Sequence, residues 1–210
     1  MYDFKSCKYV NFWPYVGKDY ATAAHKILVL GESHYGRQEL DEYHEWTQEV
    51  VQSEFLATWD ARGRGHRWTR CFTNTANVLS PKRGANPHGV FDQIAFYNFL
   101  QKSVGNTSRD HSRLTNKMKE DSAKALDEVL RLLKPDLVVG WGWSMEWNYL
   151  PKHCNETVLE ARCGYGRLRL FNLEGCPPVP FWCMCHPSSS RFNTEAHRAC
   201  FAEIKNHLNW

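Results

Sequence analysis

Short apolar runs alternate along this chain with longer stretches that have helical periodicity. The apolar runs that stand out cover residues 27–30, 94–98, 136–142 and 179–185. Runs this short fit strands that are buried on both faces, as in a parallel sheet covered by helices. Because helical stretches separate these strands, the pattern predicts a right-handed, parallel α/β sandwich.

The clearest helical pattern covers residues 118–133, where apolar positions recur at helical spacing and Pro135 follows as a stop. Further helices are expected over residues 38–60, 68–79 and 194–208. Asn193 or Thr194 is the expected N-terminal cap of the last one. Two β-rich runs between residues 156 and 174 predict a hairpin inserted into the sandwich.

The composition fits one compact intracellular domain. The chain has 210 residues, of which 42% are hydrophobic, and no internal repeat divides it. This length is enough to bury one core, so we expect a single domain over residues 1–210. The sequence has no secretory signal and no apolar run long enough to span a membrane. We therefore expect a soluble, cytoplasmic protein that is a monomer and has no membrane partner.

The eight cysteines do not form a pattern typical of a metal site. No two of them have the CxxC spacing that many zinc sites use. Reduced thiols in a cytosol are the simpler interpretation, since disulfides are rare there. We therefore expect no metal and no cofactor.

Two polar loops contain the highest concentration of chemically reactive side chains in the sequence. A glycine, an acid, a hydroxyl, an imidazole and a phenol follow the first apolar run, at residues 31–35. A second polar loop begins with His186, Pro187 and Ser188, directly after the last apolar run. The proline restricts the direction in which the chain leaves His186. Because active sites of parallel sheets gather at the carboxyl ends of the strands, we expect the two loops to share one site.

Cations are concentrated in two glycine-containing segments between the first two apolar runs. Residues 62–70 include Arg64 and Arg67, and residues 81–88 form the second segment. Glycine lets the backbone approach a phosphate closely, and arginine supplies charged donors. We therefore expect both segments to contact phosphates, although the net charge of +3 says little by itself.

Four short patches, in their order along the chain, resemble motifs of the uracil-DNA glycosylase superfamily. Residues 31–35 look like its water-activating motif, and residues 94–98 look like its second strand, which ends in the asparagine that reads the flipped base. Residues 136–142 look like the third strand and the start of its Gly-Ser phosphate loop, here with Ser144 as the serine. Residues 186–188 resemble the His-Pro-Ser loop that enters the minor groove. The resemblance implies a three-layer α/β/α sandwich with a central, mostly parallel four-stranded sheet.

The chain departs from the family's pattern in the first motif. Many members that remove uracil have an aspartate where Ser33 stands and a proline where His34 stands, whereas other branches keep a glutamate where Glu32 stands. The resemblance therefore implies that Glu32 is the acidic group and that Ser33 helps to hold water. Tyr35 falls where one branch keeps a tyrosine that excludes a 5-methyl group, which favours uracil over thymine. Some branches bind an iron-sulfur cluster through four cysteines, but their spacing is not recognisable here and no cluster is expected.

The resemblance also implies a mechanism for removing a base from DNA, which we expect to be double-stranded. The target nucleotide rotates out of the duplex, Asn98 bonds the edge of the base, and Arg191 or Phe192 fills the gap. His186 hydrogen-bonds the base where negative charge develops. Glu32 stabilises the positive charge on the sugar and orients the attacking water.

Further roles follow from position within the motifs. Ser144, Ser188 and Ser190 are expected to bind DNA, together with Arg64 and Arg67 of the first basic segment. Trp46 lies about as far after the first motif as the family's base-stacking phenylalanine does. No lysine occupies a motif position, so we expect hydrolysis to an abasic site without strand cleavage.

Two other interpretations stay open. A nucleoside or nucleotide hydrolase would keep the fold without binding DNA, although a small substrate requires no wedge such as Arg191. A catalytically silent DNA-binding module would explain Ser33 as lost chemistry, although Glu32, Asn98 and His186 are all present. Within the glycosylase interpretation, the target is uracil, hypoxanthine or a modified pyrimidine such as a hydroxymethylcytosine derivative of phage DNA. The last target would indicate anti-phage defence rather than base-excision repair.

Overall fold

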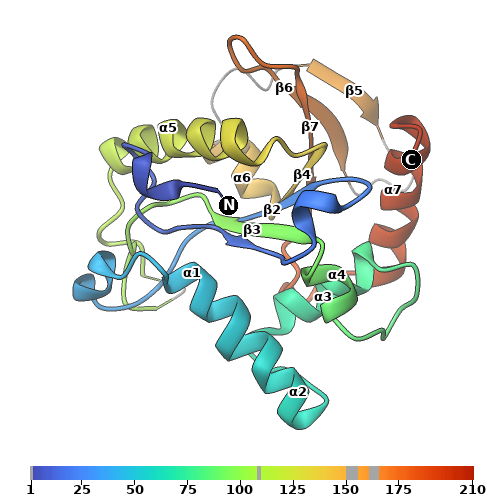
Figure 1. Ribbon diagram of the computed structural model, residues 1–210, viewed down its shortest axis with the longest axis horizontal. Coiled ribbons are helices and arrows are strands. Elements are labelled where there is room, and N and C mark those ends of the chain that lie inside the picture. Colours follow the sequence, from blue (N-terminus) through green and yellow to red (C-terminus); the bar gives the residue numbers. More distant parts are fainter. Residues whose placement is uncertain (1, 108–109, 150–155, 161–165) are drawn as a thin grey trace.

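The centre of the fold is a seven-stranded mixed sheet in the order β1-β3-β2-β4-β7-β6-β5 (Figure 1). The computed structural model describes residues 2–107, 110–149, 156–160 and 166–210. The strands are β1 Tyr15–Val16, β2 Ile27–Gly31, β3 Ile94–Asn98, β4 Leu137–Trp141, β5 Glu156–Glu160, β6 Arg167–Phe171 and β7 Val179–Met184. Neighbouring strands β3, β2, β4 and β7 are parallel, whereas β1, β6 and β5 are added antiparallel at the edges.

The prediction of a four-stranded sheet is wrong, because further strands extend the four parallel strands at both edges. β1 pairs with β3 on one side, and β6 pairs with β7 on the other. β5 then pairs with β6, so the segment expected as a hairpin insertion contributes two strands to the sheet itself. The backbone groups at the edges of the parallel centre need partners, and these short strands supply them.

Helices connect the strands and cover the sheet. Their bounds are α1 Trp46–Glu49, α2 Thr58–Arg62, α3 Arg70–Leu79, α4 His88–Phe91, α5 Asn116–Leu133, α6 Trp143–Asn148 and α7 Thr194–His207. A π-helix, Val50–Ala57, joins α1 to α2, so these elements form one continuous helical segment. Shorter 3-10 turns lie at Phe4–Ser6, Tyr20–Thr22 and Gln38–Glu42.

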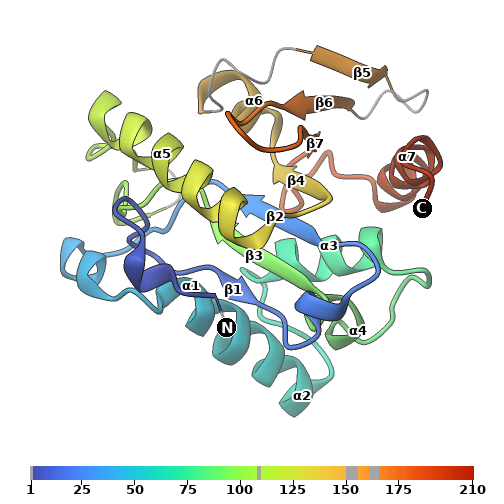
Figure 2. The same cartoon turned by 45° about the horizontal axis from the view of Figure 1, so that its top comes forward.

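The apolar runs form strands because both faces of the sheet are covered. Side chains alternate along a strand, so Leu28 and Leu30 of β2 pack in a core cluster with α5. Ile27 and Val29 of the same strand pack in a second cluster with α3 and α7. Figures 1 and 2 show α5 on one side of β2 and β3 and α3 on the other. All residues of β2, β3 and β4 are buried, which gives the loops after these strands a fixed frame.

The helix expected over residues 38–60 begins later than predicted. Residues 38–42 form a 3-10 turn, and the continuous helical segment starts at Trp46. It ends at Arg62, after which Gly63 takes a left-handed conformation with φ of 65° and closes the helix.

The other predicted helices agree with the structure to within two residues at each end. Of the two candidate caps of α7, Asn193 is the cap, since its Oδ1 accepts a hydrogen bond from the N–H of Ala196 at 3.0 Å.

In the part of the chain that the structure describes, no helix is long and apolar enough to cross a membrane. The same residues contain no group of three or more His, Cys, Asp or Glu side chains placed to hold a metal ion.

Candidate active site

The carboxyl ends of the four parallel strands surround a cavity of about 520 Å³. Gly31 at the end of β2 lies opposite Asn98 at the end of β3, and Trp141 at the end of β4 lies opposite Met184 at the end of β7. The loops after β2 and β7 and the last residues of β3 and β4 all contribute to the cavity walls. The register of the sheet thus brings residues from distant parts of the chain to one site.

His186 enters the cavity from the loop after β7, and both its backbone and its ring are held in place. The side-chain amide of Asn74 donates to the carbonyl of Pro187 at 2.6 Å, and the backbone N–H of Ser188 donates to Nδ1 of His186 at 3.2 Å. Burial lowers the pKa of His186, while the charge of Glu32 raises it by a smaller amount. The ring is therefore neutral near pH 7. Because a backbone N–H can only donate, Nδ1 is an acceptor and the single ring proton is assigned to Nε2.

Glu32 lines the same cavity directly after β2. Its Oε1 accepts a hydrogen bond from the phenol of Tyr149 at 2.9 Å. Burial raises the pKa of Tyr149, and the negative charge of Glu32 raises it further, so the phenol keeps its proton and donates. Tyr149 follows α6 and was not expected at the site, because no pattern in the sequence connects it with residue 32.

Asn98 and His34 are buried and bonded to each other. Nδ2 of Asn98 donates to Nε2 of His34 at 3.0 Å, and Oγ1 of Thr47 lies 2.8 Å from the same nitrogen. The ring of His34 stacks on Trp46, with centroids 4.5 Å apart. A Cβ added to Gly31 would lie 2.3 Å from Oδ1 of Asn98, so the amide packs directly against the backbone of β2. The amide is thus fixed, and its oxygen makes no hydrogen bond to the described residues.

The burial of His34 predicts a pH-dependent stability. Burial lowers the pKa of His34 to about 3, whereas the imidazole of an unfolded chain titrates near about 6.5. The unfolded state therefore binds a proton that the folded state does not, and the stabilisation is fully present above about pH 6.5 and is lost as pH falls toward about 3. We expect the free energy of unfolding to fall by about 1.4 kcal/mol per pH unit more steeply between about pH 6 and 4 than in a His34→Gln variant. Denaturant unfolding at a series of pH values measures this difference, and parallel slopes in the two proteins would contradict it.

Glu32, Asn98 and His186 thus share one cavity. No family model matches this chain, and no curated protein matches its sequence. A conclusion about function therefore depends on the chemistry of the site itself.

Other residues that the sequence indicated also line the cavity: Ser33, Tyr35, Trp46, Arg67 and Ser188. Burial raises the pKa of Tyr35, and the Ser33 hydroxyl opposes part of that rise. Ser33 Oγ is nevertheless buried without a hydrogen bond of ordinary geometry to the described residues. A bound water or ligand can supply the partner that such a hydroxyl needs.

Among the remaining expected DNA contacts, Arg64, Ser190, Arg191 and Phe192 lie outside the cavity walls that the structure describes. Three of them are exposed on the surface: Arg64, Ser190 and Arg191. Phe192 stacks on His197 with ring centroids 4.4 Å apart and planes inclined by 13°, so this ring packs against the core. Ser144 lies in α6, and its side chain falls outside the described residues.

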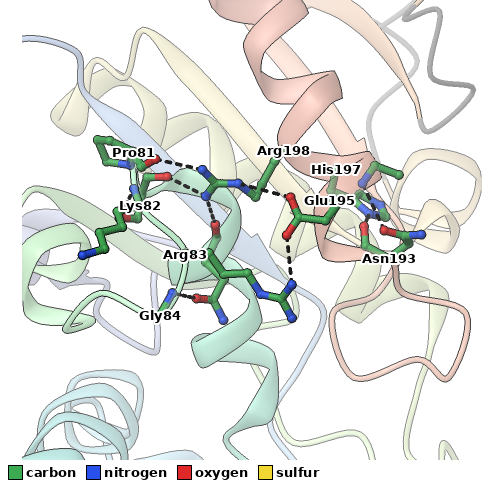
Figure 3. Close-up of polar contacts among 11 residues, drawn as sticks. Pro81, Lys82, Arg83, Gly84, Asn193, Glu195, His197 and Arg198 are labelled. Carbon is green, nitrogen blue, oxygen red and sulfur yellow. Dashed lines mark hydrogen bonds and ion pairs between the residues drawn. The ribbon is translucent and has the colours of Figure 1, made fainter.

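The basic segment 81–88 is tied to α7 (Figure 3). Arg83 forms an ion pair with Glu195 at 3.0 Å. The guanidinium of Arg198 donates to two carbonyls of the loop after α3, at 2.8 Å each. The charge of Arg83 is therefore already paired, whereas Arg67 of the other basic segment reaches the cavity.

An aromatic wall completes the site, and its two phenylalanines were not expected from the sequence. Phe72 of α3, Phe96 of β3 and Trp141 of β4 line the cavity together. The Trp141 ring lies 4.8 Å from Phe96, 5.1 Å from Phe72 and 5.9 Å from His186, measured between centroids. Phe96 stands two positions before Asn98 on the same strand, so alternation along a strand was a signal that could have placed it.

Proposed function

We propose that this protein is a monofunctional DNA glycosylase, which flips a base out of DNA and hydrolyses its N-glycosidic bond to leave an abasic site. The observation that carries the proposal is that Glu32, Asn98 and His186 line one cavity at the ends of three parallel strands. The reaction needs a carboxylate, a base-reading amide and a neutral donor, and these residues supply them.

The cavity suits a base that has left the stack. Enzymes that act on a base within a duplex extrude the nucleotide into a pocket, where it stacks against aromatic or apolar side chains. A volume of about 520 Å³ lies within the usual range for small ligands, and Phe72, Phe96 and Trp141 supply the rings. Oδ1 of Asn98 makes no hydrogen bond to the described residues, so it can accept one from the edge of the base.

Charge develops in opposite directions on the two sides of the bond that breaks. The departing base becomes negative, and the Nε2–H of His186 donates to it without the need for a protonated imidazole. The sugar becomes positive, and the carboxylate of Glu32 stabilises it and orients the water that attacks the anomeric carbon. The hydrogen bond from Tyr149 holds this carboxylate in a defined orientation.

Water is the nucleophile in this proposal. No lysine is among the described residues that line the cavity, so these walls offer no amine to form a Schiff base with the sugar. Arg67 lines the cavity and is exposed, which suits a phosphate contact beside the flipped nucleotide.

A single-turnover assay tests the proposed function. The substrates are duplexes that contain uracil, hypoxanthine, hydroxymethylcytosine, glucosylated hydroxymethylcytosine or 5-(aminopropyl)uracil, together with the free nucleosides. Free base is detected by mass spectrometry, and abasic sites are detected by alkali cleavage. We expect base release from at least one duplex, and the base released distinguishes repair from defence.

Two outcomes would contradict the glycosylase. Tight binding of the duplexes without release of any base would favour a silent DNA-binding module. Cleavage of free nucleosides alone would favour a nucleoside hydrolase.

A further inference from the structure

A second cavity, of about 310 Å³, lies beside the first and shares Trp46, Val50 and Trp68 with it. We call it the side cavity. Its other walls come from the 3-10 turn before α1 and from the helical segment that follows: Leu40, Tyr43, Glu49 and Glu54. The shared residues place the two cavities next to each other.

Aromatic rings make up much of the side cavity. Trp68 is 53% exposed and Tyr43 is 38% exposed, although both side chains are large and mostly apolar. Exposed apolar surface gathered in one place often marks a binding site. The faces of such rings bind apolar groups and also attract cations.

The polar groups of the side cavity are acidic. Interaction with the Glu49 carboxylate raises the pKa of the Tyr43 phenol, so the phenol stays protonated. Glu54 adds a second carboxylate, and no Lys, Arg or His is among the described residues that line this cavity. The walls therefore offer a ligand acceptors and negative charge. Two carboxylates beside a DNA site repel the phosphates, so they oppose binding unless the ligand brings a positive charge.

The backbone of this wall is also unusual. Val50–Ala57 is a π-helix, and π-helical turns are rare and frequently lie at functional sites. Glu49 and Glu54 have the i, i+5 spacing of its hydrogen bonds. In an α-helix such residues would point about 140° apart, whereas the wider π-turn brings them onto one face. The distortion thus places both carboxylates in the same cavity.

We propose that the side cavity is a subsite for a positively charged substituent, an alkylammonium group, on the base that the protein removes. An ammonium group carries a positive charge and donates hydrogen bonds, which matches the two carboxylates of these walls. The aromatic rings add attraction for the cation through their faces. This inference rests on the glycosylase function, and it narrows the modified pyrimidines to those that carry an amine.

Equilibrium binding tests the subsite separately from catalysis. The probe is a duplex with one 5-(aminopropyl)uracil, which is compared with the same duplex after acetylation of the amine, a change that removes the charge. A glucosylated hydroxymethylcytosine duplex serves as a neutral, hydroxylated comparison. Affinity is measured by fluorescence anisotropy with a Glu32→Gln protein, so that base release does not interfere. We expect the aminated duplex to bind about tenfold more tightly than the acetylated one.

Variants of the acidic residues provide the control. The double substitution Glu49→Gln and Glu54→Gln should abolish the preference for the amine. Glu42→Gln should leave it intact, because Glu42 is exposed and lies outside the side cavity. Equal affinity for the aminated and acetylated duplexes would overturn the proposal. A preference that survives the double substitution, or tighter binding of the glucosylated duplex, would also overturn it.

Base release by the wild-type protein from the same duplexes distinguishes the two proposals. A charge-dependent binding preference without any release supports the subsite and refutes the glycosylase. Release from the duplexes without a binding preference supports the glycosylase and refutes the subsite.

Discussion

Replacement of His186 by alanine should slow base release by about 100-fold, which corresponds to about 2.7 kcal/mol of transition-state stabilisation. The Nε2–H of His186 donates to the departing base as its negative charge develops, so its loss raises the barrier to bond cleavage. Binding of the intact substrate should change little, because the base carries no such charge before the bond breaks. The measurements are the single-turnover rate and the duplex affinity.

Ser188→Ala is the matched control for this substitution. It removes the hydroxyl that lies 2.8 Å from Nδ1 of His186, but it keeps the backbone N–H that assigns the ring proton to Nε2. Its rate should stay within about fivefold of the wild-type rate. If His186→Ala falls within the same range while DNA affinity is retained, His186 has no role in the chemical step.

Substitution of Glu32 by glutamine should reduce the rate by at least about 100-fold. Glutamine keeps the size of the side chain and can still accept a hydrogen bond from Tyr149, so the fold and the cavity should be preserved. It lacks the negative charge that stabilises the sugar cation and orients water. Single-turnover rates should therefore fall, while thermal unfolding and duplex affinity stay close to those of the wild type.

The variant Tyr149→Phe distinguishes the contribution of the Glu32 charge to the rate from the contribution of its orientation. This variant loses the hydrogen bond of 2.9 Å to Oε1 but leaves the carboxylate in place. We expect a reduction of about tenfold, smaller than that of Glu32→Gln, because one hydrogen bond is lost while the charge of the carboxylate remains. A Glu32→Gln protein as fast as the wild type would show that the reaction needs no carboxylate at this position.

The parallel centre of the sheet could be predicted from the sequence, because its strands are buried on both faces. β2, β3 and β4 contain only buried residues, and such strands appear in a sequence as uninterrupted apolar runs. Polar residues at or after their ends mark the edge where the site lies. Glu32, Asn98 and His186 could therefore be assigned to one region before any coordinates were considered.

Strands β5 and β6 were expected as a hairpin, but neither their place in the sheet nor strand β1 could be predicted, because partners far along the chain define them. β1 has only two residues and becomes a strand through pairing of Tyr15 with Phe96. β6 shows no regular alternation of buried and exposed positions, and its place in the sheet depends on pairing of Arg169 with Phe181. Neither pairing can be recognised from the order of apolar and polar residues in the sequence.

Contacts within the site could not be predicted from the sequence either. Tyr149 meets Glu32, and Thr47 meets His34, only because α6 and α1 pack beside the loop after β2. The π-helix between α1 and α2 changes which side chains face the cavities. The spacing of apolar residues along the sequence does not distinguish a π-helix from an α-helix here.

Gly31 and Asn98 should evolve as a pair. Any side chain at position 31 would place its Cβ 2.3 Å from Oδ1 of Asn98, so a larger residue there requires a shorter or displaced residue at position 98. Related sequences that read a different base should therefore show coupled exchanges at these two positions. Position 31 thus constrains which recognition residues natural or directed evolution can introduce, even though glycine has no side chain with which to touch a base.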